Sequence, residues 1–244
     1  MLCEDDTDED KTRYIALTSN SGLGYVVSFV GITVCGSLFF GIFLYFTQIL
    51  SSLIIFKLQK YSVYEYKISS TKKPFIDTVS VAVKDTTHLI FEICGFYVFF
   101  SIIKTVLVSI FNIKSSTILY SFVASFLEIS NGIQGASMLE NTALSAFFIG
   151  FSVGFGGICM CMQTFSVCNT SLNKFKFIKI KFFQGIFCGI SATIFIHFFN
   201  ISKIQEITAA TSAEFSFITV ILNSIYLFCV LFSTKMLLYK KISN

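Results

Sequence analysis

The sequence is short of charge, proline and tryptophan. Of its 244 residues, 13% are charged, one is proline (Pro74) and none is tryptophan. A soluble domain carries about 25% charged residues, so the low charge argues against an ordinary soluble domain. The first 13 residues are acidic, whereas a secretory signal peptide begins with basic and then apolar residues. The sequence therefore predicts no secretory signal peptide.

Spacings that hold a metal or build a catalytic centre are also missing. The two histidines, His88 and His197, lie far apart and form no metalloprotease-type pair. Most of the eight cysteines lie inside apolar runs, where cysteine behaves as a small hydrophobic residue. No basic cluster carries the interleaved aromatic residues of a nucleic-acid surface. We therefore expect no enzyme activity, no cofactor, no metal site and no nucleic-acid partner.

Apolar residues dominate what is present. Hydrophobic residues make up 54% of the chain, phenylalanine alone accounts for 31 residues, and the mean hydropathy is +0.76. The apolar runs are continuous, whereas a membrane β-barrel would alternate over segments of about ten residues. The sequence predicts an all-α, polytopic membrane protein with about five to six spans and a re-entrant hairpin, whose immediate partner is the lipid bilayer.

The apolar pattern divides the chain into four regions. Residues 1–57 are predicted to hold a partial first repeat, made of a broken helix and a span. Residues 58–87 are predicted to form a basic cytoplasmic loop and an amphipathic helix. Residues 88–199 are predicted to hold a second repeat, made of a span, a re-entrant hairpin, a broken helix and a span. Residues 200–244 are predicted to hold the last span and a tail.

The distribution of lysine predicts the orientation of the chain. The loops at 57–73 and 173–181 and the C-terminal tail are lysine-rich, which the positive-inside rule assigns to the cytoplasm. The loop at 113–117 has a single lysine and is predicted to face out. An odd number of crossings must then separate it from the inner loop at 173–181. Two apolar segments lie between them, so the shorter one, 118–136, is expected to enter and leave on one face. The prediction is a multi-pass protein of the cell membrane with a cytoplasmic C-terminus.

Two interruptions break apolar helices at matching places. One covers Thr18 to Gly22, and the other covers Gly154 to Gly157 inside the uncharged stretch 141–169. Each is followed by a half-helix and a full span, and the two copies run in opposite directions in the predicted topology. Inverted repeats with broken helices point to the binding site of a secondary transporter. The alternatives are simple kinks, or glycines that only allow close helix packing.

Glu128 and Asn131 are the sharpest polar pair in the predicted hairpin. On a helix they share one face. A charged side chain costs about 2.5–3.5 kcal/mol to insert, so by default it faces a cavity or a partner. Glu128 would bind a polar solute or a coupling proton beside Asn131; alternatively it lies at the membrane edge or pairs with Lys104 as a structural bridge. The predicted solute-binding residues are Thr18, Ser19, Asn20, Glu128, Ser130, Asn131, Gly132, Gly156, Gly157 and Gln163.

Several of these motifs resemble those of the sporulation integral membrane proteins of the YlbJ type, within the wider nucleoside-recognition (Gate) membrane domain group. The family's Arg and Thr-Ser-Asn match Arg13 and residues 18–20, and its Glu-x-x-Asn-Gly matches residues 128–132. Its Phe-Gly-Gly and Gln match residues 155–157 and Gln163. The proline that usually follows Thr-Ser-Asn is absent, and the resemblance implies that the N-terminal third of the family pattern is missing.

The resemblance implies a sporulation-associated, transporter-like membrane protein. It would bind or move a small polar solute at a midplane site, with a coupling ion as a further candidate partner. The alternative is a structural or assembly scaffold in spore formation that acts without transport. Glu128 and Asn131 separate the two functions, because only the first depends on their polar groups.

Overall fold

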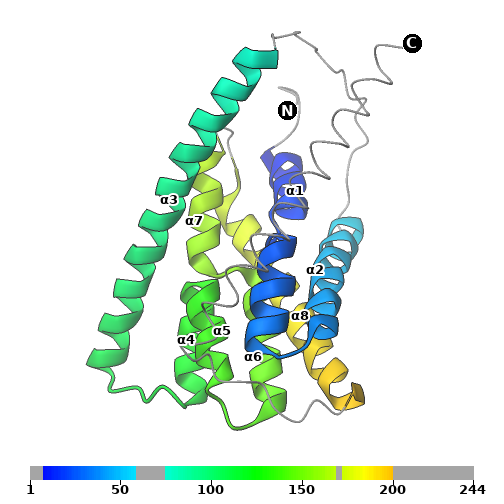
Figure 1. Ribbon diagram of the computed structural model, residues 1–244, viewed down its shortest axis with the longest axis vertical. Helices are drawn as coiled ribbons and strands as arrows, with labels where there is room; N and C mark the ends of the chain where they lie inside the picture. Colours follow the sequence, from blue (N-terminus) through cyan, green and yellow to red (C-terminus); the bar gives the residue numbers. More distant parts are fainter. Residues whose placement is uncertain (1–7, 59–74, 169–171, 200–244) are drawn as a thin grey trace.

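The computed structural model describes residues 8–58, 75–168 and 172–199 (Figure 1). These residues form helices and connecting turns, which confirms the predicted all-α class for this part of the chain. Most of the predicted loop at 57–73, and everything predicted after residue 199, lies outside the described residues. The helices are α1 (Asp8–Thr18), the π-helix η1 (Gly24–Val34), α2 (Leu38–Leu58), α3 (Phe75–Ile110), α4 (Ile118–Leu127), α5 (Ile129–Ser137), α6 (Thr142–Phe155), α7 (Gly157–Val167) and α8 (Lys174–Phe199).

Four helical segments in the described residues are long and apolar enough to cross a membrane, as judged by length and composition. They are Leu38–Leu58, Thr86–Ile110, Thr142–Val167 and Lys174–Phe199, and the third combines α6 with α7. Large apolar side chains on their outer faces remain exposed, among them Phe46. A bilayer would cover such side chains, which a soluble protein would bury. The chain is therefore a helical membrane protein.

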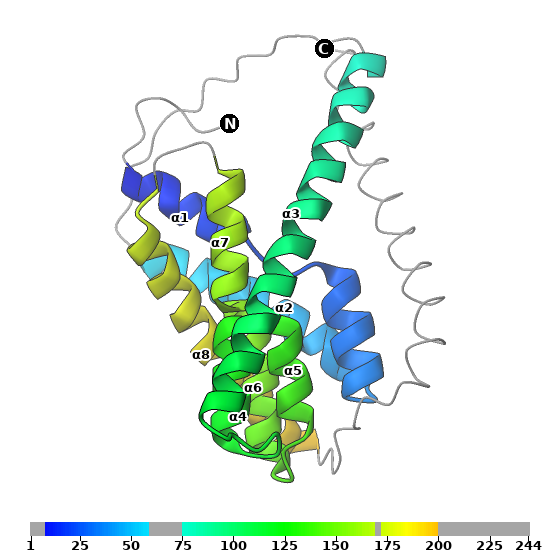
Figure 2. The ribbon, with the colours of Figure 1, turned by 90° about the vertical axis from the view of Figure 1, so that its left-hand side faces the viewer.

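The long helix α3 stands partly apart from the other helices. It contains 36 residues and is about 54 Å long at a rise of about 1.5 Å per residue. An amphipathic helix over 75–87 and a separate span from 88 were predicted, but α3 is continuous. No glycine or proline lies between Phe75 and His88 to end the first helix. Only 6% of the most apolar part of Thr86–Ile110 is buried. Figure 2 shows that the N-terminal end of α3 diverges from α1 and α7.

The centre of the fold is the packing of α6 against α8. Gly150 and Gly154, one turn apart on α6, lie directly on the backbone of α8; a Cβ on Gly150 would be 2.5 Å from the carbonyl oxygen of Cys188. Gly185 and Gly189 of α8 in turn face phenylalanine side chains of α6. Small residues four apart let two helices approach closely, which drives helix association in membranes. For Gly154, therefore, close helix packing is the correct interpretation.

A second close crossing joins η1 to α2. A Cβ on Gly31 would be 2.5 Å from Cα of Gly41, so the two backbones touch. In Figure 1, η1 descends and α2 rises, whereas α7 rises and α8 descends. These opposite directions are those that the predicted inverted repeat requires, and the repeat itself stays a prediction.

A helical hairpin forms where the re-entrant segment was predicted. The helices α4 and α5 are about 15 Å and 14 Å long, about half the thickness of the hydrocarbon core. Glu128 separates them with an extended backbone (φ −154°, ψ 139°). A Cβ on Gly132 would be 2.5 Å from Cα of Ser125, so the two helices touch at this point. Figure 2 shows the pair side by side beneath α7.

The predicted basic loop at 173–181 is wrong for most of its length. The helix α8 begins at Lys174, not at Phe182, and its first two turns contain the lysines. Phe177 and Ile180 alternate with these lysines and are buried, which gives the segment an apolar face to pack. One of the lysines, Lys181, is itself 0% exposed.

Candidate functional site

Glu128 caps the start of α5. One oxygen of its carboxylate accepts from the backbone N–H of Ser130 (2.9 Å), and the other accepts from the backbone N–H of Asn131 (2.7 Å). The side chain is 3% exposed. Glu128 is thus the N-cap of α5. The sequence predicts instead that Glu128 and Asn131 share one face of a helix, which is wrong because Glu128 precedes the helix. The two side chains still meet, because an N-cap side chain reaches the third residue of its helix.

Asn131 links this carboxylate to a lysine on α3. Its amide nitrogen donates to Glu128 (2.9 Å) and to the hydroxyl of Ser101 (3.0 Å). The ammonium of Lys104 donates to its amide oxygen at 2.6 Å. The alternative of a structural bridge between Glu128 and Lys104 is therefore present only indirectly, because the amide of Asn131 lies between the ammonium and the carboxylate. The Glu128 cluster, defined as Ser101, Lys104, Glu128, Ser130 and Asn131, contains one positive and one negative charge.

The break between α6 and α7 packs against the Glu128 turn. Gly156 and Gly157 have positive φ angles of 77° and 76°, which confirms a break and places it at these two glycines. A Cβ on Gly157 would be 2.8 Å from the backbone nitrogen of Glu128. The N-termini of α5 and α7 therefore converge here, and both carry partial positive charge that stabilises an anion.

Tyr25 reaches the same turn from η1. Its hydroxyl lies 3.0 Å from the hydroxyl of Ser130. This tyrosine is the second residue of η1, just after the first break, so the two halves of the chain meet at the hairpin turn. The sequence analysis missed Tyr25 because no local pattern distinguishes it from the other tyrosines of an apolar helix.

The first break is confirmed between the end of α1 at Thr18 and the start of η1 at Gly24. Thr18 is exposed, and its hydroxyl donates back to Tyr14 of its own helix (3.1 Å). The hydroxyl of Ser19 lies 3.5 Å from that of Thr164 on α7. The amide of Asn20 turns towards α2 and α8, where its oxygen accepts from other side chains.

A second polar network surrounds Asn20, which is the only predicted site residue that contributes its side chain to this network. The amide nitrogen of Gln184 donates to the Asn20 oxygen (2.8 Å) and to the hydroxyl of Ser52 (2.7 Å). The ammonium of Lys181 donates to Gln184 (2.7 Å) and to the backbone oxygen of Ser19 (2.6 Å). We call Asn20, Gln48, Ser52, Lys181 and Gln184 the Lys181 cluster; Gln48 contributes its backbone oxygen, which accepts from Gln184 at 3.0 Å.

The predicted site residues thus fall into three groups. Glu128, Ser130, Asn131, Gly132 and the two glycines of the second break lie together. Ser19 and Asn20 belong to the first break and its own network. Thr18 bonds within its helix, and Gln163 donates to the sulfur of Cys159 one turn earlier (3.4 Å). Neither Thr18 nor Gln163 joins the Glu128 cluster through these bonds.

An ion pair ties the start of α1 to the start of α8. The ammonium of Lys176 lies 2.6 Å from the carboxylate of Glu9. The hydrogen bond and positive charge of Lys176 lower the pKa of Glu9 from its ordinary value of 4.5. A lowered carboxyl pKa stabilises the fold above the unfolded-state pKa, and the stabilisation is lost as the pH falls through the folded-state value.

Glu9→Gln is therefore expected to lower the unfolding temperature slightly at neutral pH and to have no effect in acid. The expected effect is small because the pair lies at the surface. Thermal unfolding of wild type and variant, compared from neutral pH to below the ordinary pKa of 4.5, measures the difference. Lys176→Gln should show the same pH dependence. A difference that persists unchanged in acid would contradict the ion-pair explanation.

The site thus defines the class of the protein as a helical membrane protein with two helix breaks and a buried carboxylate between them. No protein-family model, no curated protein and no solved structure matches the chain.

Proposed function

We propose that the chain is a transporter-like integral membrane protein that binds or moves a small polar solute at the Glu128 cluster. The observation that carries the proposal is a carboxylate, 3% exposed, where a helical hairpin meets a broken helix. Buried ionisable groups in membrane helices mark solute and ion pathways by default. Discontinuous helices supply the free backbone groups that such sites need.

Several further features support this function. The breaks contain glycines and small polar residues, whose backbone groups can change partners. The hairpin turn contacts α3, η1 and α7, so a displacement of the hairpin would change contacts with both halves of the chain. Under the predicted inverted repeat, the cluster would lie near the membrane midplane with the C-terminus in the cytoplasm. The resemblance to the YlbJ-type proteins adds spore formation as the setting, and the ionisable side chain of Glu128 makes a proton a candidate coupling ion.

One observation favours the second candidate, a structural or assembly scaffold. Both oxygens of the Glu128 carboxylate already accept from α5 itself. A carboxylate used only as a helix cap would hold the hairpin in place and bind no solute. The two functions therefore differ in one respect. Transport requires the carboxylate at its exact position, whereas the scaffold requires only a residue that caps α5.

Glu128→Asp in a spore-forming host tests this difference. Aspartate is as good an N-cap residue as any, so the hairpin should still form, but its carboxylate is one methylene shorter. Under the transport function, sporulation is expected to fall towards the level of a deletion strain. Asn131→Ala should act in the same direction, and Glu140→Gln, on an exposed residue, should not.

The amount of each variant in the membrane fraction serves as the control for folding. Wild-type sporulation with Glu128→Asp and with Asn131→Ala, while deletion abolishes it, would reject the transport function and support the scaffold. A loss of sporulation at wild-type abundance with Glu128→Asp would reject the scaffold.

A further inference from the structure

We propose that the Lys181 cluster binds a small monovalent anion, at a site separate from the Glu128 cluster. The proposal extends the proposed function by a second ligand at the first break. It concerns binding alone, so it can fail while the Glu128 cluster still binds a solute, and the reverse also holds.

The first argument is the charge of Lys181. Its three hydrogen bonds go to Ser19 O (2.6 Å), Gln184 Oε1 (2.7 Å) and Asn20 Oδ1 (3.5 Å). All three partners are acceptors, which matches an ammonium with three N–H groups. All three are also uncharged, and within the described residues Lys181 forms no ion pair.

Burying the positive charge of Lys181 without an opposite charge beside it costs free energy. Lys181 is 0% exposed and lies about 10 Å along α8 from its first residue. A buried cation in a membrane helix pairs with an opposite charge or with backbone carbonyls, and only an opposite charge cancels its net charge. The Glu128 cluster follows this rule, since Asn131 links Lys104 to a carboxylate. The Lys181 cluster lacks the anion.

The second argument is the side chain of Gln48. It is 0% exposed, and neither atom of its amide has a hydrogen-bond partner. A buried polar group without a partner costs about 1–3 kcal/mol. Gln48 lies one turn before Ser52 on the same face of α2, and its own backbone oxygen bonds to Gln184. Whichever way the amide is turned, its two N–H groups lack an acceptor, and the proposal assigns them to the anion.

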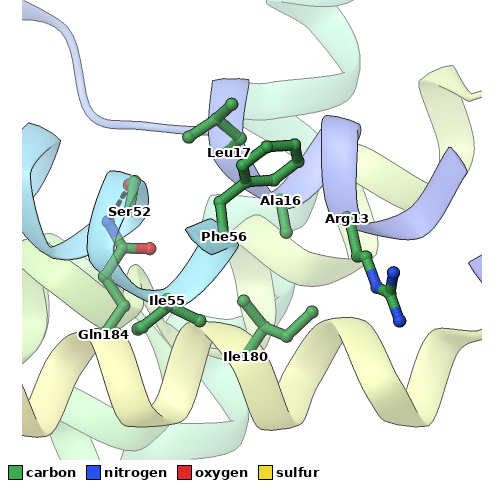
Figure 3. Close-up of a pocket in the computed structure, with 8 residues that line it drawn as sticks. All are labelled: Arg13, Ala16, Leu17, Ser52, Ile55, Phe56, Ile180 and Gln184. Atoms are coloured by element: carbon green, nitrogen blue, oxygen red, sulfur yellow. Dashed lines mark hydrogen bonds between the residues drawn. The ribbon is translucent and has the colours of Figure 1, made fainter. Parts of the chain in front are cut away.

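A small cavity borders the cluster at Ser52 and Gln184. It lies between α1, α2 and α8, and Figure 3 shows Ser52 and Gln184 at one end and Arg13 at the other. Its volume of about 10 Å³ corresponds to about one water molecule. The Arg13 guanidinium, which pairs with Asp10 at 3.2 Å, places a positive group beside this cavity. The small volume restricts the proposed ligand to the smallest anions, of which chloride and formate are tested.

Thermal unfolding of the purified full chain in a detergent with an uncharged headgroup tests the proposal. Chloride or formate is titrated into a buffer whose only anion is gluconate, and reactivity of the buried thiols reports unfolding. The unfolding temperature of the wild type is expected to rise with saturation, by about 5–11 °C at a hundredfold excess over Kd. Lys181→Met should abolish the rise, and Lys179→Gln, on an exposed lysine of the same helix, should keep it.

Gln48→Leu keeps the test decisive if Lys181→Met does not fold. Leucine removes two unpartnered polar atoms, so in gluconate this variant should be at least as stable as the wild type. It should nevertheless lose most of the rise with chloride or formate. A wild-type rise in Lys181→Met or Gln48→Leu would overturn the proposal, as would a wild-type protein that neither ion stabilises.

Discussion

Gly157→Ala is expected to lower the free energy of unfolding by about 2–5 kcal/mol. Gly157 has a φ of 76°, a conformation that costs a residue with a Cβ about 1–2 kcal/mol. The added Cβ would also lie 2.8 Å from backbone atoms of Leu127 and Glu128. Backbone cannot rotate away as a side chain can, so the hairpin turn or α7 would have to shift. The temperature at which the buried thiols of Cys159 and Cys161 become reactive measures the loss.

Two other glycines calibrate this result. Gly156→Ala meets only the flexible side chain of Met160, so it should cost less than Gly157→Ala, although its φ is also positive. Gly95→Ala on α3 has nothing within 4 Å of the new Cβ and should leave the unfolding temperature unchanged or higher. Equal unfolding temperatures for Gly157→Ala and the wild type would show that the second break does not rest on the Glu128 turn.

Glu128→Gln is expected to cost about 2–3 kcal/mol of stability. The carboxylate accepts three N–H groups on two oxygens, whereas glutamine offers one oxygen and an N–H₂ group that faces other donors. At least one buried donor of Ser130 or Asn131 therefore loses its partner. The Lys104 ammonium also loses the negative charge that Asn131 connects to it.

The same thiol-reactivity measurement separates this effect from a general loss of charge. Glu140→Gln removes a carboxylate from an exposed position and should not change the unfolding temperature. Glu128→Asp keeps the cap and should lose much less than Glu128→Gln. If Glu128→Gln unfolds at the wild-type temperature, the cap contributes no net stability.

Both helix breaks could be predicted because their causes are local. Only glycine adopts a positive φ without strain, so a glycine cluster in an uncharged stretch indicates a break such as that at Gly156 and Gly157. Small polar residues, such as those following Thr18, favour turns over helix because their side chains form hydrogen bonds with nearby backbone groups. The prediction included Gly154 in the break, although α8 packs against this glycine inside α6. Sequence alone does not distinguish a glycine needed for conformation from one needed for close contact.

The Lys181 cluster could not be predicted because its members come together only in three dimensions. Gln184 bonds to residues 132 to 164 positions away in the chain, on α2 and beyond the end of α1. The high density of lysine in 173–181 also predicts a loop there, which places Lys181 outside any helix. One local signal was available: Lys181 and Gln184 are three residues apart, so both polar groups share a face of an apolar helix. Glu128 and Asn131, which the sequence predicts as a pair, have the same spacing of three residues.

The short hairpin has a consequence for the order in which the chain assembles during synthesis. Neither α4 nor α5 can cross the bilayer alone, and their junction at Glu128 carries a charge. Asn131 meets α3, which is made earlier, whereas the turn rests on Gly157, which the ribosome adds about thirty residues later. We therefore expect the hairpin to stay at the membrane surface until α6 and α7 emerge. Insertion of this segment would then be a late tertiary step, coupled to the synthesis of the helices that follow it.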